Sequence, residues 1–416
     1  MKRREFLQTS AAAVAAFPYI AAPTVLGAND RIEVGFIGLG GRAKWLIQNE
    51  DFGEGRIRAV ADCWLPRCGE AAALRPEGEH WAKYHDYRRM FEKEKLDAVF
   101  VETTTHARVL VSIHALQAGL DVYAEKPLTL TVAEGRVLAN AVHRYRRVLQ
   151  TGTQQRSMPI NIFASKLVSS GKIGRVEKVI VCNFLAPARW QAKPGEAQPE
   201  GLNWDEWCNQ TELRPYHPEL HRGWARWWDY DGGGQSWGVS GWGTHSLDQV
   251  QAALGASHTG PVEIVPEGPG PAGKVTLRYA NGTEVRLEQE IIQDHQQLGA
   301  IFVGARGRIQ IVRGDFTAEP AELRKGAPDV TLEGPGENGF HIRNFFACMR
   351  SRKRPTADVE TGHRSTTVCH LVNICRETGR TLRWDATAER FRADEEANRL
   401  LSRPRRRGYE LPVIPS

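Results

Sequence analysis

A glycine-containing loop near the start of the chain constrains the fold more than any other feature. Residues 31–37 alternate and contain β-branched side chains, which predicts a strand, and Gly38-Leu39-Gly40-Gly41-Arg42-Ala43 follows at once. Gly38 permits a tight turn, Gly40 lets the backbone approach a pyrophosphate, and Ala43 is small where helix meets strand. A helix is predicted from Lys44, with its N-terminus facing the phosphates. This pattern predicts a dinucleotide-binding fold with cofactor contacts at Gly38, Gly40, Gly41 and Arg42.

The second predicted strand, residues 56–61, ends in an acidic residue. Asp62 lies 24 residues after Gly38, near the spacing expected for a carboxylate that binds the ribose hydroxyls of NAD. Such a carboxylate would repel a 2′-phosphate, so the sequence favours NAD over NADP. Two alternatives stay open. Asp62 could instead cap a helix or form a turn, and the nearby Arg67 leaves the choice between the two cofactors unsettled.

Three further apolar runs continue the alternation of strand and helix. Residues 96–101, 120–124 and 148–151 are predicted strands, with helices over 109–118 and 135–147 between them. This alternation predicts a doubly wound parallel sheet over residues 29–152. Side chains at the carboxyl ends of such strands lie where a dinucleotide crosses the sheet. One threonine there could serve only as a helix cap, and the expected cofactor contacts are Thr103, Thr104, His106, Glu125, Lys126 and Gln154.

The first 28 residues are interpreted as a targeting signal rather than as part of the fold. A twin-arginine pattern, Lys2-Arg3-Arg4-Glu5-Phe6-Leu7-Gln8, precedes an Ala-rich run that ends at Ala22, and small residues follow at Gly27 and Ala28. We therefore expect export to the periplasm by the twin-arginine route. The run is too short and too Ala-rich for a membrane span, so no membrane association is expected after cleavage. A lone amphipathic helix is the alternative.

Composition excludes several classes of protein. A length of 416 residues suggests two or three domains, and 41% hydrophobic and 25% charged residues are ordinary for a soluble globular protein. The net charge of +6 is too mild to indicate a nucleic-acid surface. The seven cysteines show no CxxC and no metal-ligand spacing, so neither a disulfide framework nor a metal site is expected.

Residues 153–395 are predicted to form a second domain, and residues 396–416 a tail. The segment 261–273 is rich in Pro and Gly and is expected to be a loop. The last 40 residues are polar and Arg-rich, and we expect them to wrap over the first domain or a neighbouring subunit. Strands are predicted over 173–185, 274–279, 284–292, 300–303 and 307–312, and helices over 242–254, 341–352 and 363–378.

Tryptophan is concentrated in one stretch of this second region. Eight of the twelve tryptophans lie between residues 184 and 242, and residues 186–236 are mostly irregular. Because aromatic faces stack on the C–H faces of pyranoses, this stretch could supply a sugar-binding platform, with Trp190 and Trp228 as candidates. The alternative is that a long irregular segment uses its tryptophans as a small core of its own.

Several motifs taken together resemble one known family. GFIGLGGRA, VADCW, a strand ending in TTTH, and VYAEKPLT occur in an order and spacing similar to those of the glucose–fructose oxidoreductase and inositol dehydrogenase family (Gfo/Idh/MocA). The likeness continues through Gln154-Gln155-Arg156, WGTHSLD at 242–248, HIRNF at 341–345 and GHRST at 362–366. Together with the N-terminal pattern, it resembles the exported members that carry a twin-arginine signal.

The resemblance implies a Rossmann domain followed by an α/β domain with a large open, mostly antiparallel sheet. It places the substrate between the cofactor and that sheet, and it implies homo-oligomers, dimers or tetramers, formed through the exposed face of the sheet. In dehydrogenating members, the Lys of the EKP motif and a His of the second domain serve the reacting carbinol. The matching residues here are Lys126 and His245. Taken alone, Lys126 could be an ordinary loop lysine.

One position departs from the family pattern. Many dehydrogenating members carry an Asp four residues before this His, where the chain has Gly241. Asp231, Asp248 or Arg156 could replace that acid, so Arg156 and Asp248 are candidate substrate-binding residues. Asp248 is three residues after His245, on the same helical face, and could either orient His245 or only pair with a nearby cation.

The expected function is NAD-dependent oxidation of a carbohydrate or cyclitol hydroxyl by hydride transfer. Burial beside a positively charged nicotinamide should lower the pKa of Lys126, which suits a base, with His245 as the partner acid or base. One alternative is an NAD-recycling glycosidase that oxidises, eliminates, hydrates and re-reduces its substrate. The other is a non-catalytic relative that binds a sugar. We expect a small carbohydrate as the partner.

Overall fold

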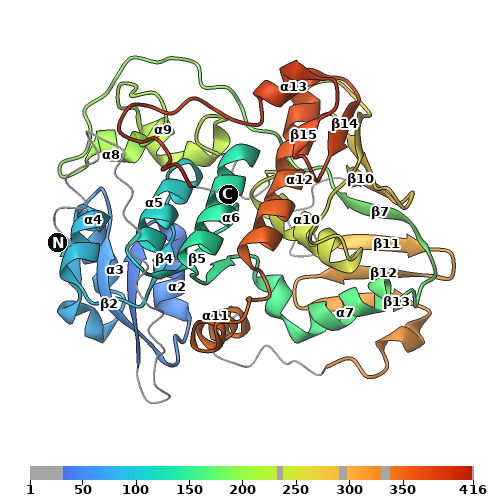
Figure 1. Cartoon of the computed structure of the whole chain (residues 1–416), viewed down its shortest axis with the longest axis horizontal. Coiled ribbons are helices and arrows are strands. Elements are labelled where there is room, and N and C mark those ends of the chain that lie inside the picture. Colours follow the sequence, from blue (N-terminus) through green and yellow to red (C-terminus); the bar gives the residue numbers. More distant parts are fainter. Residues whose placement is uncertain (1–30, 232–237, 290–297, 329–337, 415–416) are drawn as a thin grey trace.

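The structure is a computed structural model that describes residues 31–231, 238–289, 298–328 and 338–414. Two sheets with packed helices dominate the fold, one in the N-terminal part of the chain and one in the C-terminal part (Figure 1). The predicted twin-arginine signal, residues 1–28, lies outside the described residues. Within the described ranges, no helix is both long enough and apolar enough to cross a membrane.

The first domain is built on six parallel strands in the order β3-β2-β1-β4-β5-β6, which confirms the predicted doubly wound sheet. The order reverses between β1 and β4, where such sheets bind ligands at the carboxyl ends of their strands. The short β3 was not predicted. The strands are β1 (Ile32–Ile37), β2 (Gly55–Ala61), β3 (Ala82–Tyr84), β4 (Ala98–Val101), β5 (Asp121–Ala124) and β6 (Leu149–Thr151).

Helices cover both faces of this sheet, and the two faces have separate apolar clusters. Two helices begin before their predicted starts. Helix α5 begins at Thr105, so His106 lies in its first turn. Helix α6 begins after Thr131, whose side chain and that of Glu134 form a capping box. The helices are α2 (Gly41–Asn49), α3 (Pro66–Ala72), α4 (Tyr87–Lys93), α5 (Thr105–Gln117) and α6 (Val132–Tyr145).

The second domain is built on a nine-stranded sheet in the order β13-β12-β11-β7-β10-β9-β8-β14-β15. Among its described strand pairs, β7 and β10 alone run parallel, so the expected large, mostly antiparallel sheet is confirmed. The loop expected over 261–273 is wrong in part, because β8 pairs there with β9 and β14. The strands are β7 (Val176–Cys182), β8 (Glu263–Pro266), β9 (Val275–Arg278), β10 (Glu284–Gln289), β11 (Ala300–Gly304), β12 (Gly307–Val312), β13 (Asp315–Glu319), β14 (Leu382–Asp385) and β15 (Arg390–Phe391).

One face of the nine-stranded sheet is covered by helices α7 (Pro159–Ser169), α10 (Trp242–Ala253) and α12 (Val359–Thr378). Alternate side chains of β7, β10 and β11 point into that core, as a period of two requires. The residues between them are half-buried and include Ile180, Ile301 and Val303. The sheet therefore has a second face that the described helices do not cover.

Two C-terminal segments return to the first domain. Helix α11 (Gly339–Ser351) places Ile342, Phe345 and Phe346 in the first-domain core, although it lies within the segment predicted to be the second domain. The tail packs Leu411 and Ile414 against the apolar cluster on the α5 and α6 side. Figure 1 shows the C-terminus beside α6. The expectation that the last 40 residues wrap over the first domain is thus confirmed only for the end of the chain, because β14 and β15 belong to the nine-stranded sheet.

Candidate active site

The glycine loop between β1 and α2 has the geometry of a dinucleotide cradle. Gly38 has a φ of +83°, and a Cβ there would lie 2.7 Å from the backbone N and Cα of Thr103. A Cβ on Gly40 or Gly41 would meet nothing within 4 Å, so space lies open above the loop. No side chain caps the N-terminus of α2, which leaves backbone N–H groups available for phosphate oxygens. These features fit a pyrophosphate.

The two glycines give a matched pair of predictions. Gly38→Ala should lower the free energy of unfolding by about 3 kcal/mol, because the new Cβ both forces a left-handed backbone conformation and clashes with the β4 end. Gly41→Ala should change it by less than about 0.5 kcal/mol, because its Cβ meets open space. Denaturant unfolding of nucleotide-free protein measures both. Equal stabilities of the two variants would contradict this account of the loop.

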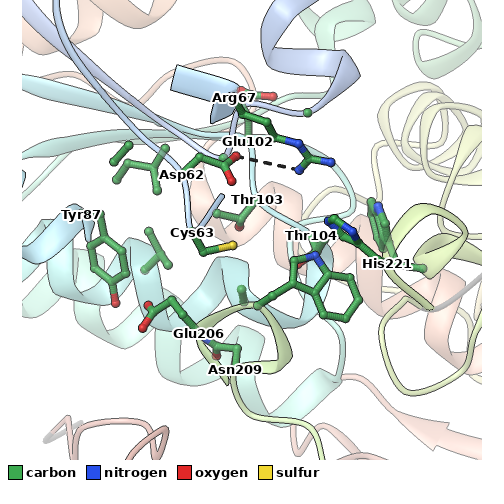
Figure 2. A pocket seen from close by; sticks show the side chains of 18 of the residues that line it. Asp62, Cys63, Arg67, Tyr87, Glu102, Thr103, Thr104, Glu206, Asn209 and His221 are labelled. Atoms are coloured by element: carbon green, nitrogen blue, oxygen red, sulfur yellow. Dashed lines mark ion pairs between the residues drawn. The ribbon is translucent and has the colours of Figure 1, made fainter. Parts of the chain in front are cut away.

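A cavity of about 350 Å³ extends from the glycine loop across the carboxyl edge of the sheet. Seven predicted cofactor contacts line it, namely Gly38, Gly40, Gly41, Arg42, Asp62, Thr103 and Thr104. Figure 2 shows Asp62 and Cys63 of the first domain, Thr104 beside His221 of the second domain, and Glu206 and Asn209 of the second domain below Cys63. The sequence did not predict the lining residues from the second domain, nor Cys63, His85, Tyr87 and Glu102.

Asp62 is held by the backbone around it. Its Oδ2 accepts a hydrogen bond from Leu39 N at 2.6 Å, and its Oδ1 accepts one from Trp64 N at 2.8 Å. Arg67 Nη1 lies 3.9 Å from the carboxylate, the ion pair marked in Figure 2. Burial raises the pKa of Asp62, which Arg67 and the two N–H groups oppose. Asp62 is therefore both a turn residue and part of the cavity wall, beside a cation.

Glu125 and Glu102 lie side by side at the carboxyl ends of β5 and β4. Glu125 Oε1 accepts hydrogen bonds from Arg42 Nε at 2.7 Å and from Gln154 Nε2 at 3.1 Å. Burial disfavours the charge of Glu125, but Arg42 and Lys126 outweigh it and lower the pKa. Burial and the charge of Glu125 raise the pKa of Glu102, and neither carboxylate oxygen of Glu102 has a hydrogen-bond partner within the described ranges. Gln154 thus positions Glu125 and does not line the cavity.

The structure brings the segments of the two predicted catalytic residues together. Lys126 Nζ donates a hydrogen bond to the carbonyl oxygen of Gly241 at 3.3 Å. Gly241 is the N-cap of α10, and His245 lies one turn further along that helix, only 6% exposed. Burial lowers the pKa of Lys126, and burial followed by the charge of Lys126 lowers that of His245 well below its usual value. Nδ1 of His245 has no hydrogen-bond partner in the part of the chain that is described.

Gly241 stands where the family resemblance led us to expect an Asp. The backbone carbonyl of Gly241 itself receives the Lys126 hydrogen bond. A buried carboxylate, Asp231, accepts a hydrogen bond from Ser240 Oγ at 3.2 Å, and its charge raises the pKa of Lys126. The charge of Glu125 raises the pKa of Lys126 more than that of Asp231 does, and Asp231 stays a candidate replacement for the missing acid.

Arg156 and Asp248 are bound to each other. Arg156 Nε donates to both carboxylate oxygens of Asp248, at 2.8 and 2.9 Å, and Asp248 Oδ1 also accepts from Ser365 Oγ at 2.6 Å. The two side chains are 10% and 2% exposed. The structure therefore shows Asp248 paired with a nearby cation, which was one of its two predicted roles. Neither Arg156 nor Asp248 lines the cavity.

The two tryptophans predicted to be sugar platforms have protein partners. The ring of Trp228 is approached by the guanidinium groups of Arg189 and Arg403, whose Cζ atoms lie 4.4 and 4.7 Å from its centroid. Trp190 packs edge-on against Trp227, with ring centroids 5.0 Å apart. Trp190 also packs against an apolar cluster of buried residues between 202 and 230. The Trp-rich stretch therefore forms a small core of its own, the alternative to a sugar-binding platform.

His106 is also engaged elsewhere. Its Nε2 bonds to the carbonyl oxygen of Trp207 at 2.8 Å, and its ring lies against Tyr230. The side chain is fully buried, and burial lowers its pKa to about 4. His106 does not line the cavity, because it lies in the first turn of α5 and is bonded to the second domain; its contact with the cofactor stays a prediction.

Both domains of the chain match the same oxidoreductase family. The NAD-binding Rossmann fold of one oxidoreductase family matches residues 32–153, and the C-terminal alpha/beta domain of the same family matches residues 161–411. The chain belongs to the Gfo/Idh/MocA oxidoreductase family. The family named from the motifs is thus confirmed, while its twin-arginine subgroup stays a prediction.

Two similar proteins show the range of activities within this family. The D-xylose 1-dehydrogenase (NADP(+)) of Hypocrea jecorina is 29% identical over 135 residues, 32% of this chain and 34% of that protein. Glycosyl hydrolase family 109 protein 2 of Phocaeicola vulgatus is 26% identical over 122 residues, 28% of this chain and 30% of that protein. The matched stretch spans about a third of each relative.

A solved structure agrees with the fold across both domains. The WlbA dehydrogenase from Bordetella pertussis, in complex with NADH and UDP-GlcNAcA, aligns with a TM-score of 0.59 at 16% identity. The alignment covers 85% of this chain and 99% of that one. At this identity the likeness supports the fold alone.

Proposed function

We propose that this member of the Gfo/Idh/MocA family oxidises a hydroxyl of a carbohydrate or cyclitol with NAD by hydride transfer. The observation that carries the proposal is the contact between Lys126 Nζ and Gly241 O, which brings the EKP segment against the helix of His245. The NAD-binding Rossmann fold supplies the cofactor site next to it. Bound NAD would accept a hydride from the carbon that carries the reacting hydroxyl.

Lys126 and His245 are suited to move the hydroxyl proton. An uncharged Lys126 donates one N–H to Gly241 O and keeps its lone pair for the substrate O–H. After proton transfer, the ammonium stabilises the oxygen from which the proton came. His245 is buried and held neutral by its lowered pKa, so it can exchange a hydrogen bond with the same oxygen or with a neighbouring hydroxyl.

The lowered pKa of Lys126 gives a pH prediction. A lowered pKa means that the uncharged, basic form is populated at lower pH than for an exposed lysine, whose usual value is 10.5. We expect kcat/KM to fall as pH falls through this lowered pKa. Because the charge of Glu125 raises the pKa of Lys126, Glu125→Gln should move the pH at which kcat/KM falls to a lower value. A pH profile of kcat/KM for both proteins checks the sign; a shift to higher pH in Glu125→Gln would contradict it.

A similar protein named as a glycosyl hydrolase favours a second candidate, an NAD-recycling glycosidase. In that reaction, oxidation of a ring carbon acidifies the neighbouring C–H, a glycosidic group is eliminated, water adds, and the same cofactor returns the hydride. The export predicted from the N-terminal pattern would suit this reaction, because an exported enzyme has no evident supply of fresh NAD. The discriminating observation is release of an aglycone without net formation of NADH. A non-catalytic sugar-binding protein is the third reading.

The nucleotide held by the purified protein tests the cofactor part of the proposal. We propose NAD rather than NADP because of the carboxylate of Asp62, although Arg67 beside it and the NADP-dependent relative favour testing both. Mass spectrometry of protein purified without added cofactor and then denatured should detect NAD. Protein that holds no nucleotide and binds neither NAD nor NADP would favour the non-catalytic reading.

Location and assembly are part of the same proposal. We propose that residues 1–28 direct export by the twin-arginine route to the periplasm, and cell fractionation of the full chain tests this. We also propose a homo-oligomer, dimer or tetramer, formed through the uncovered face of the nine-stranded sheet. Half-buried Ile180, Ile301 and Val303 on that face support it. Light scattering of Ile301→Asp should detect dissociation if the proposal holds.

A further inference from the structure

The Trp-rich stretch of the second domain is a folded unit of its own. Residues 202–224, here called the aromatic cap, contain the short helices α8 (Trp204–Cys208) and α9 (Pro218–Arg222). The rings of Trp204 and Trp207 stack at 4.5 Å, and Tyr216 and Leu220 are buried in the same cluster. Figure 1 shows α8 and α9 together above the first domain.

The aromatic cap is bonded to the edge of the first domain around the cofactor cavity. Arg88 of α4 donates to both carboxylate oxygens of Glu206, at 3.0 and 3.2 Å. Asn203 N donates to Cys63 O at 2.8 Å, one residue after Asp62. The carbonyl oxygen of Trp207 bonds to His106 Nε2, as described above. The cap is thus attached beside β2, α4 and α5, three elements that surround the cavity.

The cap lines the cofactor cavity. Its residues share this cavity with Asp62, Arg67 and His85, and the carboxylate at the end of the second strand is where this fold binds the adenosine ribose. Aromatic rings and a guanidinium group can stack on an adenine, which carries a π-face. The side chains that the cap contributes are Glu206, Trp207, Asn209, His221, Arg222 and Trp224.

The C-terminal tail fastens the cap from outside. Arg406 pairs with the carboxylate of Asp205, and its Nε donates to Asn209 O at 3.1 Å. Tyr409 Oη donates to Asp205 Oδ2 at 2.5 Å. Beyond these contacts, the tail packs Leu411 against the first-domain core. The cap is therefore held between the first domain and the tail.

We propose that the aromatic cap binds the adenosine half of NAD and that the Asp205 contacts of the C-terminal tail keep the cofactor bound between turnovers. The inference rests on the proposed function in that NAD is taken as the ligand of the cavity. Release of the adenosine half then requires the cap to move away from the first domain. A firmly held cofactor suits a reaction that returns NAD to its starting oxidation state, because bound NAD then need not exchange with free NAD.

The release rate of bound NADH tests the inference. NADH-loaded protein is mixed with excess NAD, and the loss of bound-NADH fluorescence gives the rate. Asp205→Ala removes the acceptor of Arg406 and Tyr409 and should release NADH at least about tenfold faster than wild type. Tyr409→Phe, which removes one hydroxyl, should speed release by about threefold or more. Asp315→Ala removes an exposed carboxylate paired with Arg324 and should match wild type.

The outcomes separate the inference from the proposed function. Faster release in both tail-contact variants, with the control unchanged, supports the cap. Wild-type release rates in Asp205→Ala and in Tyr409→Phe overturn it, even though NAD binding stands. If direct titration shows that wild-type protein binds no NAD, the proposed function fails and the inference falls with it. If Asp205→Ala does not fold, the NADH release rate of Tyr409→Phe, which keeps the aromatic ring, still tests the inference.

Discussion

The Lys126→Ala variant is expected to lose turnover by about 10²- to 10⁴-fold, the contribution typical of a positioned acid–base group. The loss should appear in kcat, because the Nζ group that takes the substrate proton is gone while the cofactor cavity, which Lys126 does not line, remains. Formation of reduced nicotinamide, or release of aglycone from a glycoside, measures the loss.

Two further variants make this result specific. Lys126→Arg keeps a cation at the site but cannot act as a base, so it should also be inactive. Lys172→Ala removes an exposed lysine and should match wild type. Wild-type turnover in Lys126→Ala, with NAD bound, would show that a group other than Lys126 takes the proton of the substrate hydroxyl.

The Asp248→Asn variant should lower the free energy of unfolding by about 3–5 kcal/mol. Asp248 and Arg156 form a buried ion pair, and removing one charge leaves the other desolvated and without compensation. Denaturant unfolding measures the loss. Asp315→Asn, at an exposed ion pair with Arg324, should cost less than about 1 kcal/mol.

The same variant decides between a structural and a substrate-binding role for this pair. A structural role predicts lost stability with KM nearly unchanged at a temperature where the variant is folded. A raised KM in a variant of wild-type stability would restore the substrate-binding interpretation of Arg156 and Asp248.

The first domain was predictable because its signals are local. Strands β1, β2, β4 and β5 are largely apolar runs of four to seven residues, each followed by a helix, and the glycine loop marks the crossing point. Short strands without such a pattern, β3 and β8 among them, were missed. The large antiparallel sheet and the role of His245 came from the family resemblance, since no local pattern specifies them.

Several predicted site residues have contacts with distant segments that the sequence did not reveal. His106 was expected to face the cofactor, but Trp207, 101 residues later, takes its Nε2. Trp228 was expected to be exposed to sugar, but Arg403 of the tail reaches it from 175 residues away. The second-domain side chains that line the cavity could not be assigned for the same reason. The excess of tryptophan was the one available signal, and it pointed to a small core as well as to a binding surface.

The structure shows which groups surround Lys126. The family resemblance implied an acid at position 241, where this chain has Gly241. Lys126 instead has the Gly241 carbonyl as a hydrogen-bond acceptor, and the negative charges near it are those of Glu125 and, with a smaller effect, Asp231. A backbone acceptor at this point holds the Nζ group without adding a second charge beside it.

The most direct test is to mix NAD-loaded protein with a panel of sugars, cyclitols and glycosides and to follow the absorbance of the reduced nicotinamide. The account predicts that at least one compound reduces the bound cofactor, lastingly in a dehydrogenase and transiently with release of an aglycone in a recycling glycosidase. It predicts that Lys126→Ala shows neither signal. Protein that holds NAD yet gives no absorbance change and no aglycone with any compound would contradict the central claim that Lys126 and His245 serve hydride transfer at this site.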